Sequence, residues 1–196
     1  MSSFESEKST LNETDYEVSI NYENLISQIA RLINKIINKN EEKDEYLKYV
    51  MDQSDLFFHS NYLPNISFED YMFRIRHYSQ IEDSILIYAL IYVDKLITKG
   101  IFISQYNIYR IFLSCIFISC KLYDDKKYNL NIMSKIGGVT ELELFNLEYE
   151  FCSLLNFQLY INDNIYYQYQ DFLLSEIYKN KFDDLYEGWC NMIFYF

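Results

Sequence analysis

The sequence predicts an all-α protein built around one hydrophobic core. Half of the 196 residues are hydrophobic, which supplies enough apolar surface for a packed interior. The chain holds one proline and four glycines, so it offers few of the tight turns that a many-stranded sandwich requires. Apolar residues recur instead at the three- and four-residue spacing of amphipathic helices. Together these observations favour long helices over strands.

The N-terminal third is expected to hold a tail, one helix and a connecting segment. Residues 1–20 are polar and acidic with little periodicity, which indicates a flexible tail. Within residues 21–66, a helical apolar stripe begins at Tyr22 and ends near Ile37, where charged side chains interrupt it. Pro64 marks a turn before the next helix, so the residues between the stripe and this turn form the connecting segment.

Residues 67–160 are expected to fold as five helices, one of them central. Ser67 precedes the first helix, whose acidic first turn complements the helix dipole. The second helix spans about residues 82–98 and has a very regular apolar stripe. Ser104 is the expected N-cap of the third helix, which covers about residues 105–123 and is apolar on most sides. A helix that is apolar all round must be buried, so we place the third helix at the centre of the fold.

Two further helices complete this region. A short fourth helix is expected over about residues 130–136, with Gly137 and the glycine that follows it as the stop signal. Thr140 and Glu143 form a capping-box pattern, in which each side chain satisfies a backbone N–H at the start of a helix. The fifth helix is therefore expected to begin at this pair.

A C-terminal extension is expected over residues 161–196. One more helix starts after Asn162 or Asp163 and reaches about Ile177. The aromatic-rich stretch that begins at Phe182 has no clear pattern and receives no assignment. The residues after the fifth helix are too few for a second copy of the five-helix unit, and no internal repeat is present.

Charge and cysteine usage exclude several classes of protein. The net charge of −12 argues against a nucleic-acid partner, because binding to phosphates needs a basic surface. The four cysteines, Cys115, Cys120, Cys152 and Cys190, have no CxxC spacing, and no secretory signal precedes them. We therefore expect reduced thiols in an intracellular protein of the cytoplasm, the nucleus or both. No stretch reaches the roughly 20 apolar residues of a membrane span, so no membrane partner is expected.

A search for enzymatic motifs gives none. The sequence contains no dinucleotide-binding, Walker, nucleophile-elbow or zinc-protease pattern. His59 and His77 have no matched cysteines nearby, so they are too few for a zinc site. The Gly137-Gly138 pair is better explained as a helix C-cap than as a phosphate loop. We expect a non-catalytic protein with no catalytic residue, cofactor, metal or small-molecule substrate.

Four charged residues stand beside apolar stripes. Lys121 closes the central helix, Glu148 follows Leu147 on the fifth helix, and Asp94 and Arg74 flank core positions of the second and first helices. A charge at the edge of a core is costly unless it is paired or hydrogen-bonded. Such charges either reach solvent or pair with one another, or they hydrogen-bond the backbone of a partner, and the residue pattern leaves both readings open.

Several sequence blocks also match a known family in order and spacing. The blocks are Ile91-Tyr92-Val93-Asp94-Lys95-Leu96, Asn107-Ile108-Tyr109-Arg110-Ile111, Cys120-Lys121-Leu122-Tyr123-Asp124-Asp125, Lys127-Tyr128-Asn129, Ser134-Lys135-Ile136-Gly137-Gly138-Val139 and Leu147-Glu148-Tyr149-Glu150-Phe151. With these blocks, residues 67–160 resemble the cyclin box, specifically that of the P-type or U-type cyclins of plants and the phosphate-response cyclins of fungi. The resemblance covers roughly residues 22–175 and implies a single five-helix cyclin box with flanking N- and C-terminal helices.

The resemblance implies a function and a partner. Cyclins bind and activate the catalytic subunit of a cyclin-dependent protein kinase by positioning its regulatory helix and its activation loop. By position, Lys121 and Glu148 match the family's lysine and glutamate, which hydrogen-bond the kinase backbone. Asp125 matches a residue that makes a charged contact with a kinase arginine. The remaining kinase-binding positions form an apolar groove for the regulatory helix: Leu122, Cys152, Phe157 and Leu159.

The resemblance also implies a structural pair, and the chain departs from the larger cyclins in two ways. Arg74 and Asp94 match an arginine and an aspartate that form a buried internal ion pair. The surrounding stretch, Phe73-Arg74-Ile75-Arg76-His77, lacks the apolar motif with which larger cell-cycle cyclins recruit substrates. The chain also lacks a second five-helix repeat, as is typical of the P-type group.

Three other functions compete with kinase activation. A cyclin-fold scaffold or adaptor would keep the fold without activating a kinase, and mutation of the groove would separate the two. A transcription factor of the general factor IIB type would have two repeats, a basic surface and a zinc ribbon, whereas this chain is acidic and has a single box. A small helical enzyme would turn over a substrate as a purified chain, but no motif supports it.

Overall fold

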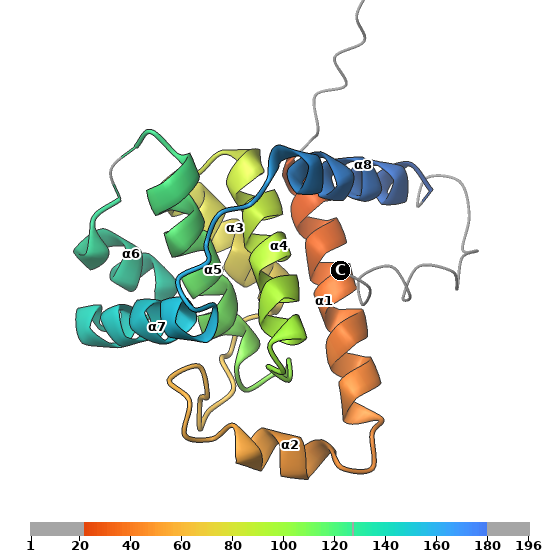
Figure 1. Cartoon of the computed structure of the whole chain (residues 1–196), viewed down its shortest axis with the longest axis vertical. Helices are drawn as coiled ribbons and strands as arrows, with labels where there is room; N and C mark the ends of the chain where they lie inside the picture. Colours follow the sequence, from red (N-terminus) through yellow and green to blue (C-terminus); the bar gives the residue numbers. More distant parts are fainter. Residues whose placement is uncertain (1–21, 127, 180–196) are drawn as a thin grey trace, which may run out of the picture.

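Eight α-helices and no strand make up the computed structural model over the residues that it describes, 22–126 and 128–179 (Figure 1). The helices are α1 (Tyr22–Glu41), α2 (Tyr46–Asp52), α3 (Phe68–Ser79), α4 (Asp83–Thr98), α5 (Ile108–Tyr123), α6 (Leu130–Gly137), α7 (Glu141–Leu154) and α8 (Asp163–Lys179). The predicted all-α class is confirmed. The expected tail at residues 1–20, the stretch from Phe182 and Cys190 lie outside the described residues, as does part of the 161–196 extension.

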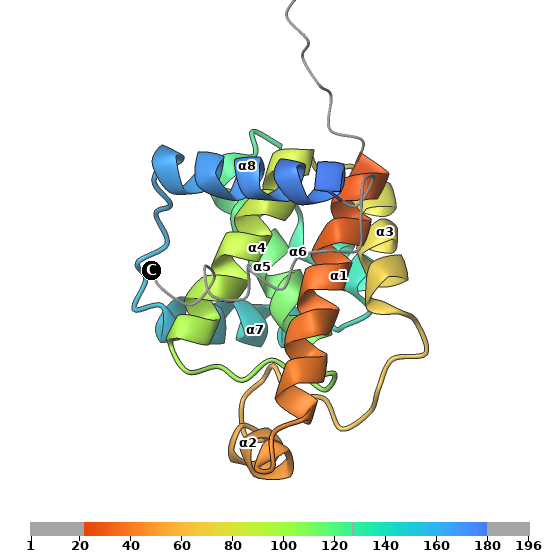
Figure 2. The same ribbon diagram turned by 90° about the vertical axis from the view of Figure 1, so that its right-hand side faces the viewer.

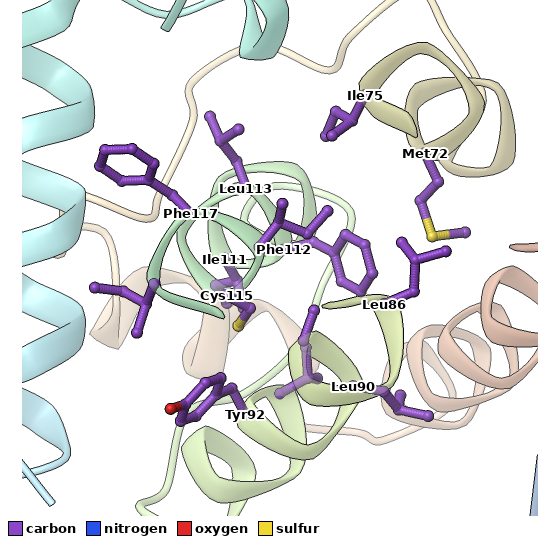
Figure 3. Close-up of a cluster of buried hydrophobic side chains, with 14 of the residues drawn as sticks. Met72, Ile75, Leu86, Leu90, Tyr92, Ile111, Phe112, Leu113, Cys115 and Phe117 are labelled. Carbon is purple, nitrogen blue, oxygen red and sulfur yellow. The ribbon is translucent and has the colours of Figure 1, made fainter. Parts of the chain in front are cut away.

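Helix α5 occupies the centre of the fold, as its composition predicts. Every residue from Ile111 to Cys120 is buried. Helix α4 packs along one side of α5 and α7 along another. In the close-up of the core, Phe112 points from α5 toward Leu86 of α4 and Met72 of α3, whereas Phe117 points to the opposite side (Figure 3). The remaining helices lie outside the group formed by α4, α5 and α7.

The outer helices pack against α3, α4 and α7 and against one another. Helix α1 packs against α3, α4 and α8, and α6 packs against α3 and α7. Helix α8 crosses the ends of α1 and α4 (Figure 2). Arg31 of α1 and Glu176 of α8 form an ion pair at 3.8 Å, with side chains that are 41% and 13% exposed. Ile29 and Ile33 of α1 and Leu173 of α8 belong to the same hydrophobic core as the five central helices, so apolar burial also holds the two flanking helices in place.

The capping signals at Ser67, Gly138 and Thr140 end or begin helices in the structure. The Ser67 hydroxyl accepts a hydrogen bond from the backbone N–H of Asp70 at 3.0 Å and so caps α3. Thr140 and Glu143 form the capping box of α7 in both directions. Gly138 ends α6 in the left-handed conformation, with φ of 72°, which a residue without a Cβ adopts at little cost. These boundaries therefore follow from local chemistry.

Three boundaries differ from the prediction. Helix α1 continues past Ile37 to Glu41, and a short helix α2 lies in the expected connecting segment. Ser104 is not an N-cap: α5 begins at Ile108, and the Asn107 side chain accepts from the backbone N–H of Ser104 at 2.9 Å. Both α2 and this turn depend on tertiary contacts, such as the stacking of Tyr49 on Phe102 with ring centroids 4.9 Å apart.

The expected buried ion pair between Arg74 and Asp94 is wrong. Arg74 is exposed on α3, where its Nη2 donates to the Lys135 carbonyl at the end of α6. Asp94 is buried on α4 and accepts a hydrogen bond from the Tyr169 hydroxyl of α8 at 2.6 Å. The Tyr169 hydroxyl thus takes the place of a cation at Asp94. The guanidinium group of Arg74 lies instead at the C-terminus of α6, where the helix dipole favours positive charge.

Asp94 gives the fold a pH dependence of known sign. Burial raises the pKa of its carboxyl group, and the hydrogen bond from Tyr169 opposes this only in part. Because the folded state favours the protonated form, Asp94 contributes stability at acid pH that is lost as the pH rises through its raised pKa. We expect the free energy of unfolding of the wild type, relative to Asp94→Asn, to fall as the pH rises above about 4, the ordinary pKa of an aspartate in the unfolded chain.

Denaturant unfolding at a series of pH values checks this expectation. Asp52→Asn, at an exposed carboxyl of α2, is the matched control and should follow the wild type. Parallel curves for the wild type and Asp94→Asn would show that the Asp94 carboxyl has no raised pKa in the folded state.

Gly137 is required by its contact with α5. A Cβ at this position would overlap the Cδ2 and Cδ1 atoms of the buried Leu113. Alanine is the better helix former by about 1 kcal/mol, yet we expect Gly137→Ala to destabilise the protein by about 1–3 kcal/mol because of this overlap. In a Leu113→Ala background the same change should be neutral or stabilising. A double-mutant cycle in urea measures both, and a stabilised single Gly137→Ala variant would contradict the packing argument.

Candidate functional site

Lys121 and Glu148 form an ion pair where α5 emerges from the core. Lys121 lies in the last turn of α5 and Glu148 in the middle of α7, and the Lys121 Nζ is 2.5 Å from the Glu148 Oε1. The Nζ also lies 4.3 Å from the centroid of the Phe117 ring. The two side chains remain 40% and 23% exposed, so the pair is accessible from solvent. The structure therefore brings together two of the four charged residues that the sequence singled out.

The burial pattern of α7 explains why Glu148 reaches the surface beside Lys121. Leu144, Leu147 and Phe151 of α7 are buried and face the core. Residues that follow these positions by one lie at the edge of the buried stripe, because successive helix residues are separated by about 100°. Glu148 occupies such an edge, next to the end of α5. Core packing of α7 thus fixes the position of the carboxylate.

Apolar side chains flank the ion pair. Cys152 lies one turn after Glu148 and is buried, and burial, together with the Glu148 carboxylate, raises the pKa of its thiol. The thiol therefore stays protonated and behaves as a small apolar group. Leu122 follows Lys121 and is 48% exposed. An exposed leucine beside a charge pair is available to a binding partner.

The segment after α7 is held against α4 and α5 by hydrogen bonds. The Leu159 carbonyl accepts from the Tyr92 hydroxyl at 2.6 Å and from the Tyr123 hydroxyl at 3.3 Å. The same Tyr123 oxygen accepts from the backbone N–H of Ile161 at 2.9 Å. Leu159 itself is partly buried against the core. The segment therefore follows a fixed course past α5 and α4 to the start of α8 (Figure 1).

Phe157 stands out on this segment because of its backbone. Asn156 and Phe157 both have positive φ, 50° and 58°. Asparagine tolerates this conformation, but for a bulky residue it is strained. Phe157 is 66% exposed, so packing of its side chain in the core does not offset the backbone strain. Strained residues of this kind cluster at functional sites, which makes Phe157 a candidate contact residue.

Asp125 occupies a less organised position. It lies in the turn after α5 and is exposed. Within residues 22–126 and 128–179, no hydrogen bond or ion pair joins Asp125 to Lys121 or Glu148. These two residues pair with each other, between α5 and α7. The structure thus groups six of the seven expected binding residues along α5, α7 and the following segment, with Asp125 at their edge.

Sequence reasoning missed a second apolar stripe on α7. Leu142, Phe145 and Tyr149 are 69%, 56% and 62% exposed and follow one another at helical spacing. Helix α7 therefore carries a buried stripe and an exposed one, and both spacings are visible in the sequence. The signal was present in the three- and four-residue pattern, but periodicity alone does not show which of two stripes faces the core.

The residues that the structure describes hold neither a cluster of metal-ligating side chains nor a membrane-spanning helix. No group of three or more histidine, cysteine, aspartate or glutamate side chains is placed to hold a metal ion among them. None of the helices in the described part of the chain is long and apolar enough to cross a membrane.

Comparison with known proteins identifies the family. The family model described as Cyclin matches residues 23–159. The chain belongs to the cyclin family. It is 27% identical to Cyclin-U1-1 of Arabidopsis thaliana over 80% of this chain and 75% of the relative, and 30% identical to Cyclin-U4-2 of the same plant over 79% and 71%. It is 27% identical to the PHO85 cyclin-like protein psl1 of Schizosaccharomyces pombe over 83% and 71%.

These findings confirm the predicted family and subgroup. The cyclin resembles the U-type and P-type plant cyclins and psl1. Cyclins are non-catalytic regulatory subunits of protein kinases, so the expectation of a non-enzymatic protein is also confirmed. Membership of the family carries a general role in the regulation of cyclin-dependent kinases.

The strain at Phe157 of this cyclin gives a stability prediction. Holding a residue with a Cβ at positive φ lowers the stability of the fold by roughly 1–2 kcal/mol. Glycine adopts this conformation without steric strain, although it loses more conformational entropy on folding than other residues. We expect Phe157→Gly to be more stable than Phe157→Ala by about 0.5–1 kcal/mol. Thermal or urea unfolding of the two variants measures the difference. An alanine variant as stable as the glycine variant would mean that the backbone at this residue is not held in the left-handed region.

Proposed function

We propose that this cyclin binds and activates a cyclin-dependent protein kinase through the surface formed by α5, α7 and the segment after α7. The binding residues are Lys121, Leu122, Asp125, Glu148, Cys152, Phe157 and Leu159. The observation that carries the proposal is the accessible Lys121–Glu148 pair, bordered by an exposed leucine and an exposed phenylalanine. We refer to these seven residues as the kinase-binding surface.

The ion pair supports recognition of a protein backbone. The ammonium group of lysine has three donors, and one of them reaches Glu148. The Glu148 carboxylate has a second oxygen, Oε2, that accepts hydrogen bonds. The pair therefore offers a donor and an acceptor side by side, which complements a backbone carbonyl and a backbone N–H of the kinase. Hydrogen bonds to charged groups are shorter and stronger than those between neutral groups, so two of them fix the register of the partner.

The exposed apolar groups provide apolar surface that a bound kinase would remove from water. Leu122 and Phe157 are 48% and 66% exposed, which is costly in water unless a partner covers them. Binding energy at protein interfaces concentrates in a few such groups, especially aromatic ones. The exposed stripe of α7, with Phe145 and Tyr149, extends this area beyond the residues expected from the sequence.

Activation follows if the cyclin prefers the active form of the kinase. A kinase holds ATP correctly only when its strand lysine pairs with the glutamate of its regulatory helix. A cyclin that contacts this helix in its inward position, and orders the activation loop, shifts the population of the kinase toward the active state. The shift depends on the difference in affinity for the two states, not on the affinity itself.

The charged pair yields a prediction that separates binding from folding. An accessible ion pair contributes about 0.2–1 kcal/mol to stability, so Glu148→Ala and Lys121→Ala should unfold almost like the wild type. If the pair becomes buried against the kinase, each variant should lose about 2–5 kcal/mol of binding free energy. Calorimetry with the purified kinase subunit measures the binding loss. If an alanine variant binds the kinase with wild-type affinity, the residue that it replaces does not belong to the kinase-binding surface.

A pull-down tests the function itself. The tagged cyclin is used to capture proteins from its own cell extract, and the eluate is assayed for kinase activity. We expect a cyclin-dependent kinase and its activity to elute with the wild type and with Lys35→Glu, a charge reversal at an exposed position of α1. Lys121→Glu should lose both. Elution of the kinase without activity would indicate a scaffold, and the absence of any kinase would refute the proposal.

A further inference from the structure

A hollow lies beside the kinase-binding surface, between the end of α4 and the segment after α7. Its volume is about 450 Å³. It is lined by Lys95, Thr98, Lys99, Leu155, Phe157, Gln158, Leu159 and Tyr160. Phe157 and Leu159 thus belong both to this hollow and to the kinase-binding surface, so the two are continuous. A partner that covers Phe157 also comes to lie over the hollow.

The charged side chains that line the hollow are both lysines. Lys95 and Lys99 are one turn apart at the end of α4. The Lys95 Nζ is held in place, because it donates to the Tyr160 carbonyl at 3.0 Å and lies 5.7 Å from the centroid of the Tyr92 ring. Burial lowers the pKa of Lys95, which a nearby anion would counteract. Lys99 is exposed at the rim.

The charge that lines the hollow is opposite in sign to the net charge of the chain. The net charge of the whole sequence is −12, yet no acidic side chain lines the hollow. Both lysines complement the C-terminal dipole of α4, but that role needs no hollow and no apolar wall. The wall is supplied by Leu155, Phe157 and Leu159. Positive charge beside apolar surface matches a partner segment that carries a carboxylate next to apolar residues.

We propose that this hollow receives an aspartate or glutamate side chain of the bound kinase, with Lys99 as its main ionic partner and Lys95 as a second donor. The inference rests on the proposed function, since it assumes that a kinase covers Phe157. Lys99 is exposed, whereas Lys95 is partly buried and already donates one hydrogen bond to the Tyr160 carbonyl, so the carboxylate approaches Lys99 first. The contact makes Lys99 a residue that selects among kinases by the charge opposite it.

Affinity measurements on the purified complex test the inference. The probe is the kinase subunit that elutes with the wild-type cyclin, and the variants are Lys99→Glu, Lys99→Ala and the control Lys35→Glu, whose charge change is the same as that of Lys99→Glu. We expect Lys99→Glu to weaken binding roughly 10-fold or more at low salt, with a smaller effect for Lys99→Ala and a smaller difference at high salt. Wild-type folding of each variant is checked by its unfolding curve.

Carbodiimide cross-linking identifies the carboxylate directly. The reagent activates a kinase carboxyl group, and attack by the Lys99 amine forms an amide bond with net loss of water, so only side chains in contact are joined. Mass spectrometry should find Lys99 joined to an aspartate or glutamate of the kinase, and the cross-link should be lost in Lys99→Ala.

The outcomes separate this inference from the proposed function. If Lys121→Glu abolishes binding while Lys99→Glu behaves like Lys35→Glu, the kinase-binding surface stands and the acidic contact at the hollow is refuted. A cross-link from Lys99 to another part of the cyclin would also refute it. If no kinase is captured by the wild type, the proposed function and the contact at the hollow both fail.

Discussion

Helix α5 is stable only when it is covered on all sides, because every residue from Ile111 to Cys120 is removed from water. Helices α4 and α7 cover two of its sides directly. The small polar residues on α5 do not interrupt this packing, since Ser114 and Ser119 donate to carbonyls of their own helix. Burial of one fully apolar helix thus dictates that the neighbouring helices surround it, and the hydrophobic gain from that burial holds the fold together.

The same constraint positions the residues of the proposed kinase-binding surface. Lys121 is the first exposed residue after the buried part of α5, so it marks the place where the core ends. Because α5 is held on all sides, the ammonium group is presented from a rigid support, and Glu148 on α7 fixes its direction. A site built on packed helices loses little conformational freedom on binding, which favours affinity. The kinase-binding surface therefore depends on the core, although its residues lie outside it.

The segment after α7, part of the proposed kinase-binding surface, shows how backbone strain is maintained. Phe157 has a positive φ that its side chain disfavours. Two tyrosine hydroxyls, from Tyr92 and Tyr123, hold the Leu159 carbonyl nearby and leave the chain few alternative paths. The Phe157 N–H also donates to the Cys152 carbonyl at 2.8 Å. These hydrogen bonds offset the strain and keep an aromatic ring exposed beside the hollow that contains Lys99.

The sequence by itself determined seven of the eight described helices, the capping box of α7 and the central place of α5, because periodicity and capping act over three or four residues. It did not predict α2 or the start of α5, which depend on tertiary contacts. Its blocks of family resemblance also singled out Lys121, which the structure pairs with a glutamate. Only the tertiary structure decided that Asp94 bonds Tyr169 and not Arg74, that Phe157 is strained, and that a hollow lies beside it. Asp94 and Tyr169 are 75 positions apart. Their contact follows from how α8 crosses α4, and that angle is set by packing of side chains from separate helices, which no local pattern records.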